Sequence, residues 1–160
     1  MNLYIIRHGK AEISSEMKPD EERELTEEGI PLVNNAAGKW KEFINTFDLV
    51  LSSPLKRAIQ TAVIIKEVFD IKKDVVEVPS LLNGGTTQDL LNEVSSLRLK
   101  DIAMIGHQPD IANHISRLTS HSDINLKIPP AALAKISFKD KLAIGEGILE
   151  FLIPPGNKKG

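Results

Sequence analysis

Three short, almost continuously apolar runs constrain the fold of this chain more than any other feature of its sequence. They are residues 2–7 (NLYIIR), 48–52 (DLVLS) and 101–106 (DIAMIG). Strands that are covered on both faces have this composition, whereas strands with one solvent-facing side alternate apolar and polar residues. The three runs therefore predict strands of a parallel sheet that carries helices on both of its faces.

Helical patterns occupy the segments between these runs. A helix is predicted from Thr26, which suits the N-cap position and precedes apolar residues at helical spacing. A second helix is predicted from Ser53 and Pro54, which suit the N-cap and the first helical position. Weaker patterns predict a helix over residues 86–97 and another that starts at Pro109.

The last quarter of the chain has a different pattern. Residues 132–138 (ALAKISF) alternate in polarity, residues 147–153 (GILEFLI) are mostly apolar, and Gly145 and Gly147 lie where the two runs are connected. This pattern predicts an antiparallel pair of strands at a sheet edge. The chain as a whole is expected to be a three-layer α/β/α domain over residues 1–154, with a mainly parallel central sheet, a late antiparallel edge pair and a short tail at 155–160.

Composition excludes several classes of protein. No apolar run reaches the roughly 18 residues that cross a bilayer, and Met1 leads into a predicted strand without a basic segment, so neither a membrane span nor a secretory signal is expected. The absence of cysteine excludes disulfides, a thiolate nucleophile and a cysteine-based zinc site. A cytoplasmic location is the expectation that fits these features.

The charged residues are unevenly distributed. The net charge of −2 argues against a nucleic-acid partner, because such proteins neutralise phosphates with an excess of cations. Residues 10–28 nevertheless hold eight acidic and three basic side chains. Charge runs of this kind are usually solvated, so this segment is predicted to be a solvated loop.

Four cationic or potentially cationic side chains follow the predicted parallel strands. Arg7 and His8 end the first strand, His107 follows the third, and Arg57 lies in the first turn of the helix after the second. Parallel strands place their carboxyl ends at one edge of the sheet, where ligands bind. A cation in the first turn of a helix is disfavoured by about 0.3–1 kcal/mol unless an anion binds there. The four residues therefore predict an anion site, most plausibly for phosphate.

Two histidines in a phosphate site indicate phosphoryl transfer through an imidazole nucleophile, with the arginines stabilising the charge on the transferred group. Gly9 is expected to let the backbone turn and to keep Cβ bulk away from the phosphate. His114 and His121 have no metal-ligand spacing and are expected to be structural or surface residues. Neither a metal nor an organic cofactor is expected.

The motif LYIIRHGKAE (residues 3–12) resembles the signature of the histidine phosphatase superfamily. The resemblance continues through RELTEEG (23–29), VLSSPLKRAIQTA (50–62), MIGHQPDIANHIS (104–116) and AALAKISF (131–138), which occur in the family's order. Because the chain is short, it is most similar to the small phosphohistidine phosphatases of the SixA type, which lack the insertions that cap the site in larger relatives. The resemblance implies an open site that a phosphorylated side chain of another protein could enter.

By this resemblance, His8 is the nucleophile that becomes phosphorylated. Arg7, Arg57 and His107 would form the phosphate pocket, and His107 would also stabilise the transferring group. Lys10 and Gln108 are further candidates for substrate binding.

The chain departs from the family at two places. Many relatives carry a glutamate, the general acid, in the region matching residues 78–85, where this chain has no carboxylate; Glu77, Asp89 or the acidic segment 16–28 could substitute. A phosphohistidine leaves as an imidazole, which is easily protonated near neutral pH, so the missing acid favours N–P hydrolysis. The second departure is PPAALA (129–134), where a Thr-Gly pair is expected before the alanine, so the pocket floor is expected to differ in shape.

Three functions remain open on the sequence alone. The leading hypothesis is a cofactor-independent phosphohistidine phosphatase that acts on phosphohistidine in a protein. The second is a phosphatase of small phosphate monoesters. The third is a phosphate-binding module without activity, which the set of Arg7, His8, Arg57 and His107 argues against, because binding alone requires no nucleophile.

Overall fold

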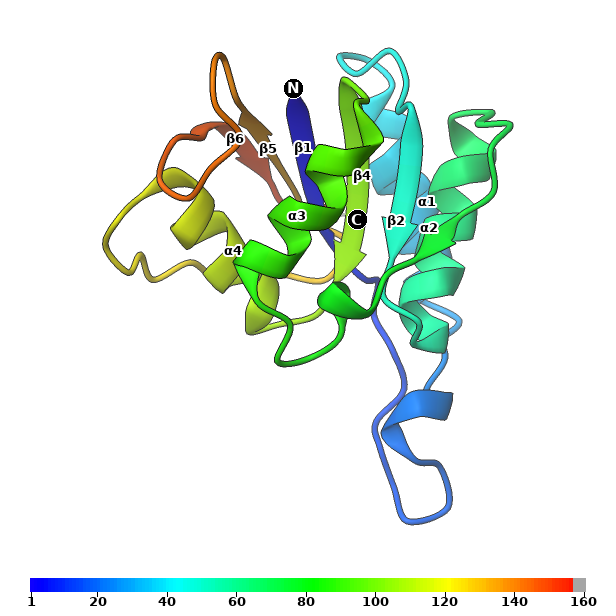
Figure 1. The fold of residues 1–160 in the computed structure, drawn as a ribbon. Helices are drawn as coiled ribbons and strands as arrows, with labels where there is room; N and C mark the ends of the chain where they lie inside the picture. Colours follow the sequence, from blue (N-terminus) through cyan, green and yellow to red (C-terminus); the bar gives the residue numbers. More distant parts are fainter. Residues whose placement is uncertain (157–160) are drawn as a thin grey trace.

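A six-stranded sheet separates two layers of helices in the computed structural model, which describes residues 1–156 (Figure 1). The strand order is β3-β2-β4-β1-β5-β6. The strands are β1 (Asn2–Arg7), β2 (Leu49–Ser52), β3 (Val76–Glu77), β4 (Asp101–Gly106), β5 (Leu133–Ser137) and β6 (Ile148–Ile153). The predicted three-layer fold, with a mainly parallel sheet and a late antiparallel edge pair, is confirmed.

The parallel strands end at the same edge of the sheet. β4 lies between β1 and β2, and Arg7 at the end of β1 pairs in register with Gly106 at the end of β4. On the other side of β4, Ser52 at the end of β2 pairs with Ile105. Residues that follow these strands therefore leave the sheet side by side.

Four helices cover the two faces of the sheet, with α1 (Gly29–Trp40) and α2 (Lys56–Val68) on one face and α3 (Thr87–Leu97) and α4 (Asp110–Thr119) on the other (Figure 1). Successive side chains of β1 alternate between the two layers: Ile5 packs in the core with α3 and α4, while Ile6 packs with α1 and α2. This double burial explains why β1 is continuously apolar.

The helix starts agree with the sequence in most cases. Thr86 precedes α3 and its hydroxyl accepts a hydrogen bond from the Asp89 N–H (3.1 Å), and α4 begins one residue after Pro109. α1 is assigned from Gly29, but the Thr26 hydroxyl accepts the Gly29 N–H at 3.0 Å, which is the capping interaction predicted for Thr26.

The late strands form the predicted antiparallel pair. β6 pairs with β5, and β5 pairs with β1, both antiparallel. The short strand β3 was not predicted, because two exposed residues carry no periodic pattern. Among residues 1–156, no helix is long and apolar enough to cross a membrane. The predicted tail lies partly outside the described residues.

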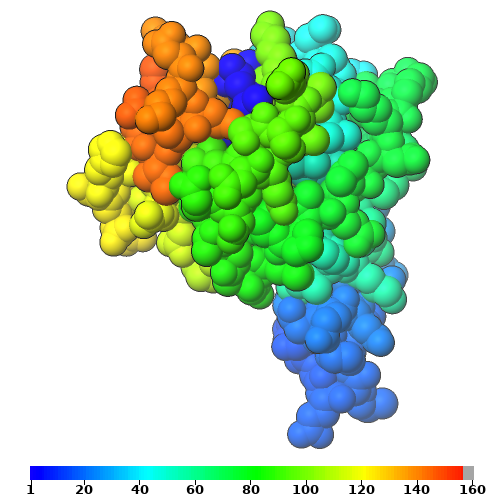
Figure 2. Space-filling model, in the orientation of Figure 1, coloured from blue at the N-terminus to red at the C-terminus, as the bar shows by residue number. Residues whose placement is uncertain are grey.

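Residues 10–28, called the arm below, project from the body of the molecule (Figures 1 and 2). Two backbone hydrogen bonds close its root, from the Thr26 N–H to the Lys10 carbonyl and from the Glu12 N–H to the Glu24 carbonyl, both at 2.9 Å. A 3-10 turn, η1 (Asp20–Glu22), lies in the returning half of the arm. The arm leaves the sheet directly after His8 and Gly9, so its root borders the candidate site.

Candidate active site

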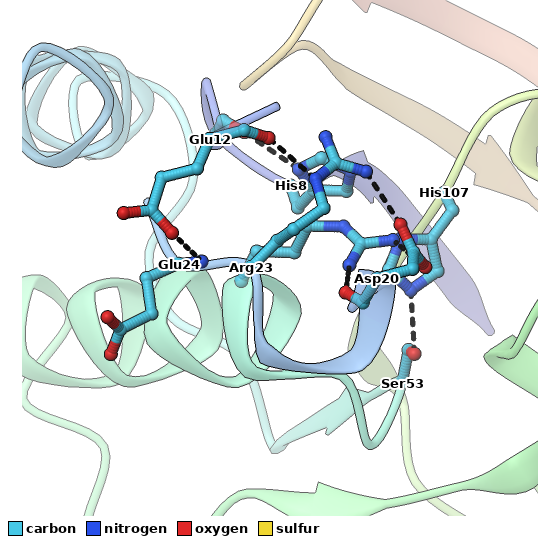
Figure 3. Close-up of polar contacts among 9 residues, drawn as sticks. His8, Glu12, Asp20, Arg23, Glu24, Ser53 and His107 are labelled. Carbon is cyan, nitrogen blue, oxygen red and sulfur yellow. Dashed lines mark hydrogen bonds and ion pairs between the residues drawn. The ribbon is translucent and has the colours of Figure 1, made fainter. Parts of the chain in front are cut away.

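The sheet brings together the four residues that the sequence placed at strand ends. The rings of His8 and His107 lie 5.0 Å apart between centroids, and the charges of Arg7 and Arg57 both act on His8. Figure 3 shows His107 bonded to Ser53, with His8 and the polar residues of the arm in the same view. The expected convergence on one sheet edge is therefore present in the fold.

His8 is held as a neutral imidazole with one defined tautomer. Its Nδ1 lies 2.7 Å from the carbonyl oxygen of Gly9, which can only accept a hydrogen bond, so Nδ1 carries the hydrogen. The lone pair is consequently on Nε2. Burial, together with the charges of the neighbouring His107 and Arg57, lowers the pKa of His8 to about 3. At neutral pH His8 thus has an unprotonated nitrogen available for attack.

His107 is also buried and neutral. Burial, followed by the charge of Arg57, lowers the pKa of His107 to about 4. Its Nε2 lies 2.7 Å from the hydroxyl of Ser53, while its buried Nδ1 has no hydrogen-bond partner among residues 1–156. The prediction of Ser53 as the N-cap of the second helix is wrong, because α2 begins only at Lys56 and the Ser53 hydroxyl orients His107 instead.

Arg57 is buried at the start of α2, with 3% of its surface exposed. Its Nη1 donates to the backbone carbonyl of Asp20 (2.7 Å) and its Nη2 to the Asp20 carboxylate (3.0 Å). Its buried Nε has no hydrogen-bond partner in the described part of the chain. The guanidinium is therefore held against the arm and keeps one unpartnered buried donor.

Arg7 connects the site to the segment before β5. Its Nη1 donates to the carbonyl of Ile128 at 2.8 Å, and its buried Nε is unpartnered among the described residues. A buried donor without a partner costs free energy, and a phosphoryl oxygen is an acceptor that would satisfy it. Arg7, Arg57 and His107 each present such an atom.

Asp20 and Arg23 belong to the site although the sequence did not single them out. The Asp20 carboxylate accepts a hydrogen bond from Arg23 Nη1 (2.7 Å) in addition to the one from Arg57 (Figure 3). The hydrogen bond from Arg23 has the larger effect, and together with the one from Arg57 it holds the pKa of Asp20 below its usual value. The prediction of a solvated loop is thus correct for the exposed part of the arm, whereas Asp20 is half-buried and lies against Arg57.

The two additional substrate-binding candidates lie away from these contacts. Lys10 pairs with Glu28 near the start of α1, and its side chain is largely exposed. Gln108 precedes α4, and its Oε1 accepts a hydrogen bond (3.2 Å) from the N–H of Ala112 in the first turn of that helix. Their roles in substrate binding remain predictions.

Gly9 is required for the packing of α1 against β1. A Cβ at this position would lie 2.5 Å from Cγ2 of Val33 in α1, so the glycine allows α1 to approach β1 closely. The Gly9 N–H donates to the hydroxyl of Thr61 in α2 at 3.1 Å. The backbone carrying His8 is therefore fixed by both helices of that layer.

The region without the expected glutamate borders the site. Asn83 lines a cleft of about 580 Å³ together with Asp20 and Leu55, so this cleft opens beside Arg57. The hydroxyl of Ser80 is committed to the Glu93 carboxylate (2.5 Å), and Asp89 is committed to the cap of α3. Unlike Asp89, Asp20 therefore directly contacts one of the four converging residues, Arg57.

The second departure from the family, at PPAALA, has a visible backbone consequence. Ala131 has a φ of 58°, in the left-handed region that favours glycine. Its N–H donates to the carbonyls of Arg7 and His8 at 3.1 and 3.2 Å. The turn behind His8 is thus formed with an alanine in a conformation that a glycine would adopt more easily.

The other histidines have structural positions, as expected. His114 is buried in α4 and its Nδ1 lies 2.9 Å from the hydroxyl of Thr87 in α3, which joins the two helices of that layer. His121 is exposed and lies against Gly145.

Comparisons with known proteins agree with the geometry. The sequence model of the histidine phosphatase superfamily (branch 1) matches residues 3–110. The chain is 25% identical over 147 residues to the phosphohistidine phosphatase SixA homolog of Haemophilus influenzae, a match that covers 85% of this chain and 87% of that protein. It is 39% identical over 71 residues to a 2,3-bisphosphoglycerate-dependent phosphoglycerate mutase of Nautilia profundicola, which covers 43% of this chain but only 31% of the mutase.

Among solved structures, the protein histidine phosphatase SixA complexed with tungstate superimposes with a TM-score of 0.86 and 22% identity, covering 97% of each chain. This likeness establishes the same fold over the whole chain.

Proposed function

Because this chain belongs to the histidine phosphatase superfamily and is an enzyme of that phosphatase family, we propose that it removes the phosphoryl group from phosphohistidine in a protein, with His8 as the nucleophile. The observation that carries the proposal is the state of His8: a buried, neutral imidazole whose Nδ1–H is bound to Gly9 and whose Nε2 is unprotonated. Such a nitrogen can attack phosphorus without prior loss of a proton.

In the first step, the Nε2 lone pair of His8 forms a bond to phosphorus while the bond from phosphorus to the substrate imidazole nitrogen breaks. The electron pair of the broken bond stays on the substrate nitrogen, which takes up a proton from solvent. Arg7 and Arg57 neutralise the phosphoryl oxygens, and the buried Nδ1 of His107 is positioned to donate to one of them when the Ser53 hydroxyl donates to Nε2.

In the second step, water attacks phosphorus and the bond to His8 Nε2 breaks. This releases inorganic phosphate and returns His8 to the neutral form. The proton that the water loses as it bonds to phosphorus passes to solvent. Neither step requires a metal or an organic cofactor for its balance, which supports the proposal of a cofactor-independent enzyme.

The nature of the leaving group favours phosphohistidine over a phosphate ester. Asp20 is the carboxylate in contact with Arg57, and hydrogen bonds from Arg23 and Arg57 hold its pKa low, so it is a poor proton donor. An alkoxide leaving group needs such a donor, whereas an imidazole is protonated by water near neutral pH. The similarity to the SixA homolog of Haemophilus influenzae over most of both chains supports the same substrate class.

The test compares variants at two histidines. We expect His8→Ala to reduce turnover of a histidine-phosphorylated protein by at least about a thousandfold, because it removes the attacking atom. His121→Ala, which changes an exposed histidine, should retain the wild-type rate. Trapping with radiolabelled substrate and an alkaline denaturing quench, in which the N–P bond is stable, should detect a phosphoenzyme in the wild type and none in His8→Ala.

The same assay separates the alternative functions. Higher kcat/KM values on a panel of phosphate monoesters than on phosphohistidine would identify a monoesterase. Binding of phosphate without any trapped phosphoenzyme would identify a module without activity. Retained activity in His8→Ala would exclude the proposed mechanism.

A further inference from the structure

The arm combines a root inside the candidate site with a tip that projects into solvent (Figure 2). At the root, Asp20 binds Arg57 through both its backbone carbonyl and its carboxylate. At the tip, residues 15–18 form a tight turn closed by two backbone hydrogen bonds of 3.1 Å between Ser15 and Lys18. A molecule that places a phosphoryl group in the pocket therefore lies next to the arm.

The arm is ordered by its own ion pairs before any partner binds. Lys18 contacts the carboxylates of Glu12 (2.5 Å) and Glu24 (3.5 Å), which connects the outgoing and returning halves of the arm. Arg23 donates through Nε to the carbonyl of Glu12 at 2.6 Å. Such preorganisation lowers the conformational entropy that binding would otherwise cost.

The tip exposes two large apolar side chains. Ile13 is 89% exposed and Met17 is 96% exposed, more than the other large apolar side chains that the structure describes as exposed. Such side chains on an ordered projection gain free energy when a partner covers them, and methionine adapts to varied apolar surfaces.

The charges of the arm point to the chemistry of the partner. Of its eight acidic residues, four make no ion pair with any residue in 1–156: Glu16, Glu21, Glu22 and Glu27. All four are exposed. Carboxylates of this kind attract cationic partners and repel acidic ones.

We infer that the arm is a docking element for the phosphorylated protein and selects a basic segment with an apolar side chain close to the phosphohistidine. This inference rests on the proposed function, because it concerns the same substrate. Ile13 and Met17 would contact the apolar side chain, and the unpaired carboxylates would contact lysines or arginines. The arm would thereby supply the substrate contacts that a site without capping insertions lacks.

The test uses three phosphohistidine substrates prepared with phosphoramidate. They are a synthetic peptide with lysines and a leucine around a single phosphohistidine, a matched peptide with glutamates and serine, and free phosphohistidine. The wild type should have its highest kcat/KM on the lysine–leucine peptide. The double variant Ile13→Ser/Met17→Ser should lose about tenfold on that peptide and less than twofold on free phosphohistidine.

Two further variants sharpen the test. Glu16→Gln/Glu21→Gln should reduce the preference for the basic peptide at low salt and have little effect at high salt, where charges are screened. Ile124→Ser removes an apolar side chain that is 44% exposed outside the arm and should leave all three rates unchanged. Because all five substituted side chains are exposed, thermal unfolding should confirm that each variant is folded.

The outcomes separate this inference from the proposed function. If the wild type hydrolyses all three substrates and the tip variant changes none of them, or changes peptide and free phosphohistidine equally, the docking role is excluded and the proposed function stands. If sedimentation shows a dimer that the tip variant dissociates, the tip serves self-association and the docking role is likewise excluded. If the wild type hydrolyses no phosphohistidine substrate, the proposed function fails and the inference fails with it.

Discussion

Arg57 shows how a single residue can carry information at both the sequence and the structural level. Its place in the first turn of α2 is unfavourable for a cation and predicted an anion site. The structure adds that the anion held against it is the side chain of Asp20. Under the proposed function, a substrate phosphoryl group and the Asp20 carboxylate would therefore compete for the same guanidinium.

This competition leads to a prediction for Asp20→Asn. The substitution removes the negative charge beside Arg57 and keeps the shape of the side chain, so orthophosphate and tungstate should inhibit about tenfold more strongly, since like charges at this distance disfavour each other by about 1 kcal/mol or more. Inhibition constants measured against a phosphohistidine substrate would show the change. Glu21→Gln removes a neighbouring carboxylate without an ion pair and serves as the control.

The opposite result has a definite meaning. Weaker oxyanion inhibition in Asp20→Asn would show that Asp20 orients Arg57 for binding and does not compete with the phosphoryl group.

The residue scale also shows where sequence reasoning reached its limit. Arg7, His8, Arg57 and His107 were identified because topology alone brings strand ends together. Ser53 was assigned to a helix cap because the same hydroxyl suits either role, and only the position of β4 beside β2 places His107 within 2.7 Å of it.

At the scale of elements, α1 depends on one glycine and tolerates change at another. A Cβ on Gly29 would lie 2.0 Å from the carbonyl oxygen of Lys10, where backbone meets backbone at the root of the arm. A Cβ on Gly38, nine residues later in the same helix, would have no atom within 4 Å. The two positions form a matched pair for substitution by alanine.

We expect Gly29→Ala to lower the free energy of unfolding by about 1–3 kcal/mol, because the arm and α1 must move apart. Gly38→Ala should raise it by about 0.5–1 kcal/mol, because alanine is the better helix former. Urea denaturation of the three proteins tests both signs. Equal free energies of unfolding for Gly29→Ala and the wild type would show that the root of the arm can shift without loss of stability.

The elements themselves were predictable where a pattern extended over several residues. The buried strands follow from apolar runs, and the starts of α3 and α4 follow from helical spacing and from Pro109. β3 was not predicted, because two residues are too few for a pattern. The projection of the arm was not predicted either, because exposed polar residues have no periodicity to interpret.

For the whole molecule, the buried histidines couple stability to pH. Folding lowers the pKa of His8 to about 3 and that of His107 to about 4, while unfolded histidines titrate near 6.5. Below about pH 6.5 the unfolded chain therefore binds more protons than the folded one. The stability that these groups contribute is complete above that pH and is lost as the pH falls toward 4.

Thermal unfolding should accordingly show a falling midpoint between pH 6.5 and 5, a window above the range in which carboxylates such as Asp20 titrate. The double variant His8→Asn/His107→Asn should have a shallower slope in this window. His114, whose pKa is also lowered by burial, remains in the variant and should account for part of the residual slope. Parallel slopes for variant and wild type would contradict the neutral state assigned to His8 and His107.

By itself, the sequence determined the parallel sheet, its two helical layers and the convergence of two arginines and two histidines at one edge, because apolar periodicity and strand topology are local properties or follow directly from them. Only the tertiary structure decided which hydroxyl orients His107, why Gly9 must lack a side chain, and that the arm returns a carboxylate to Arg57. These contacts join residues 24 to 54 positions apart in the chain. Such distant pairings depend on how the packed elements meet, which no local pattern records.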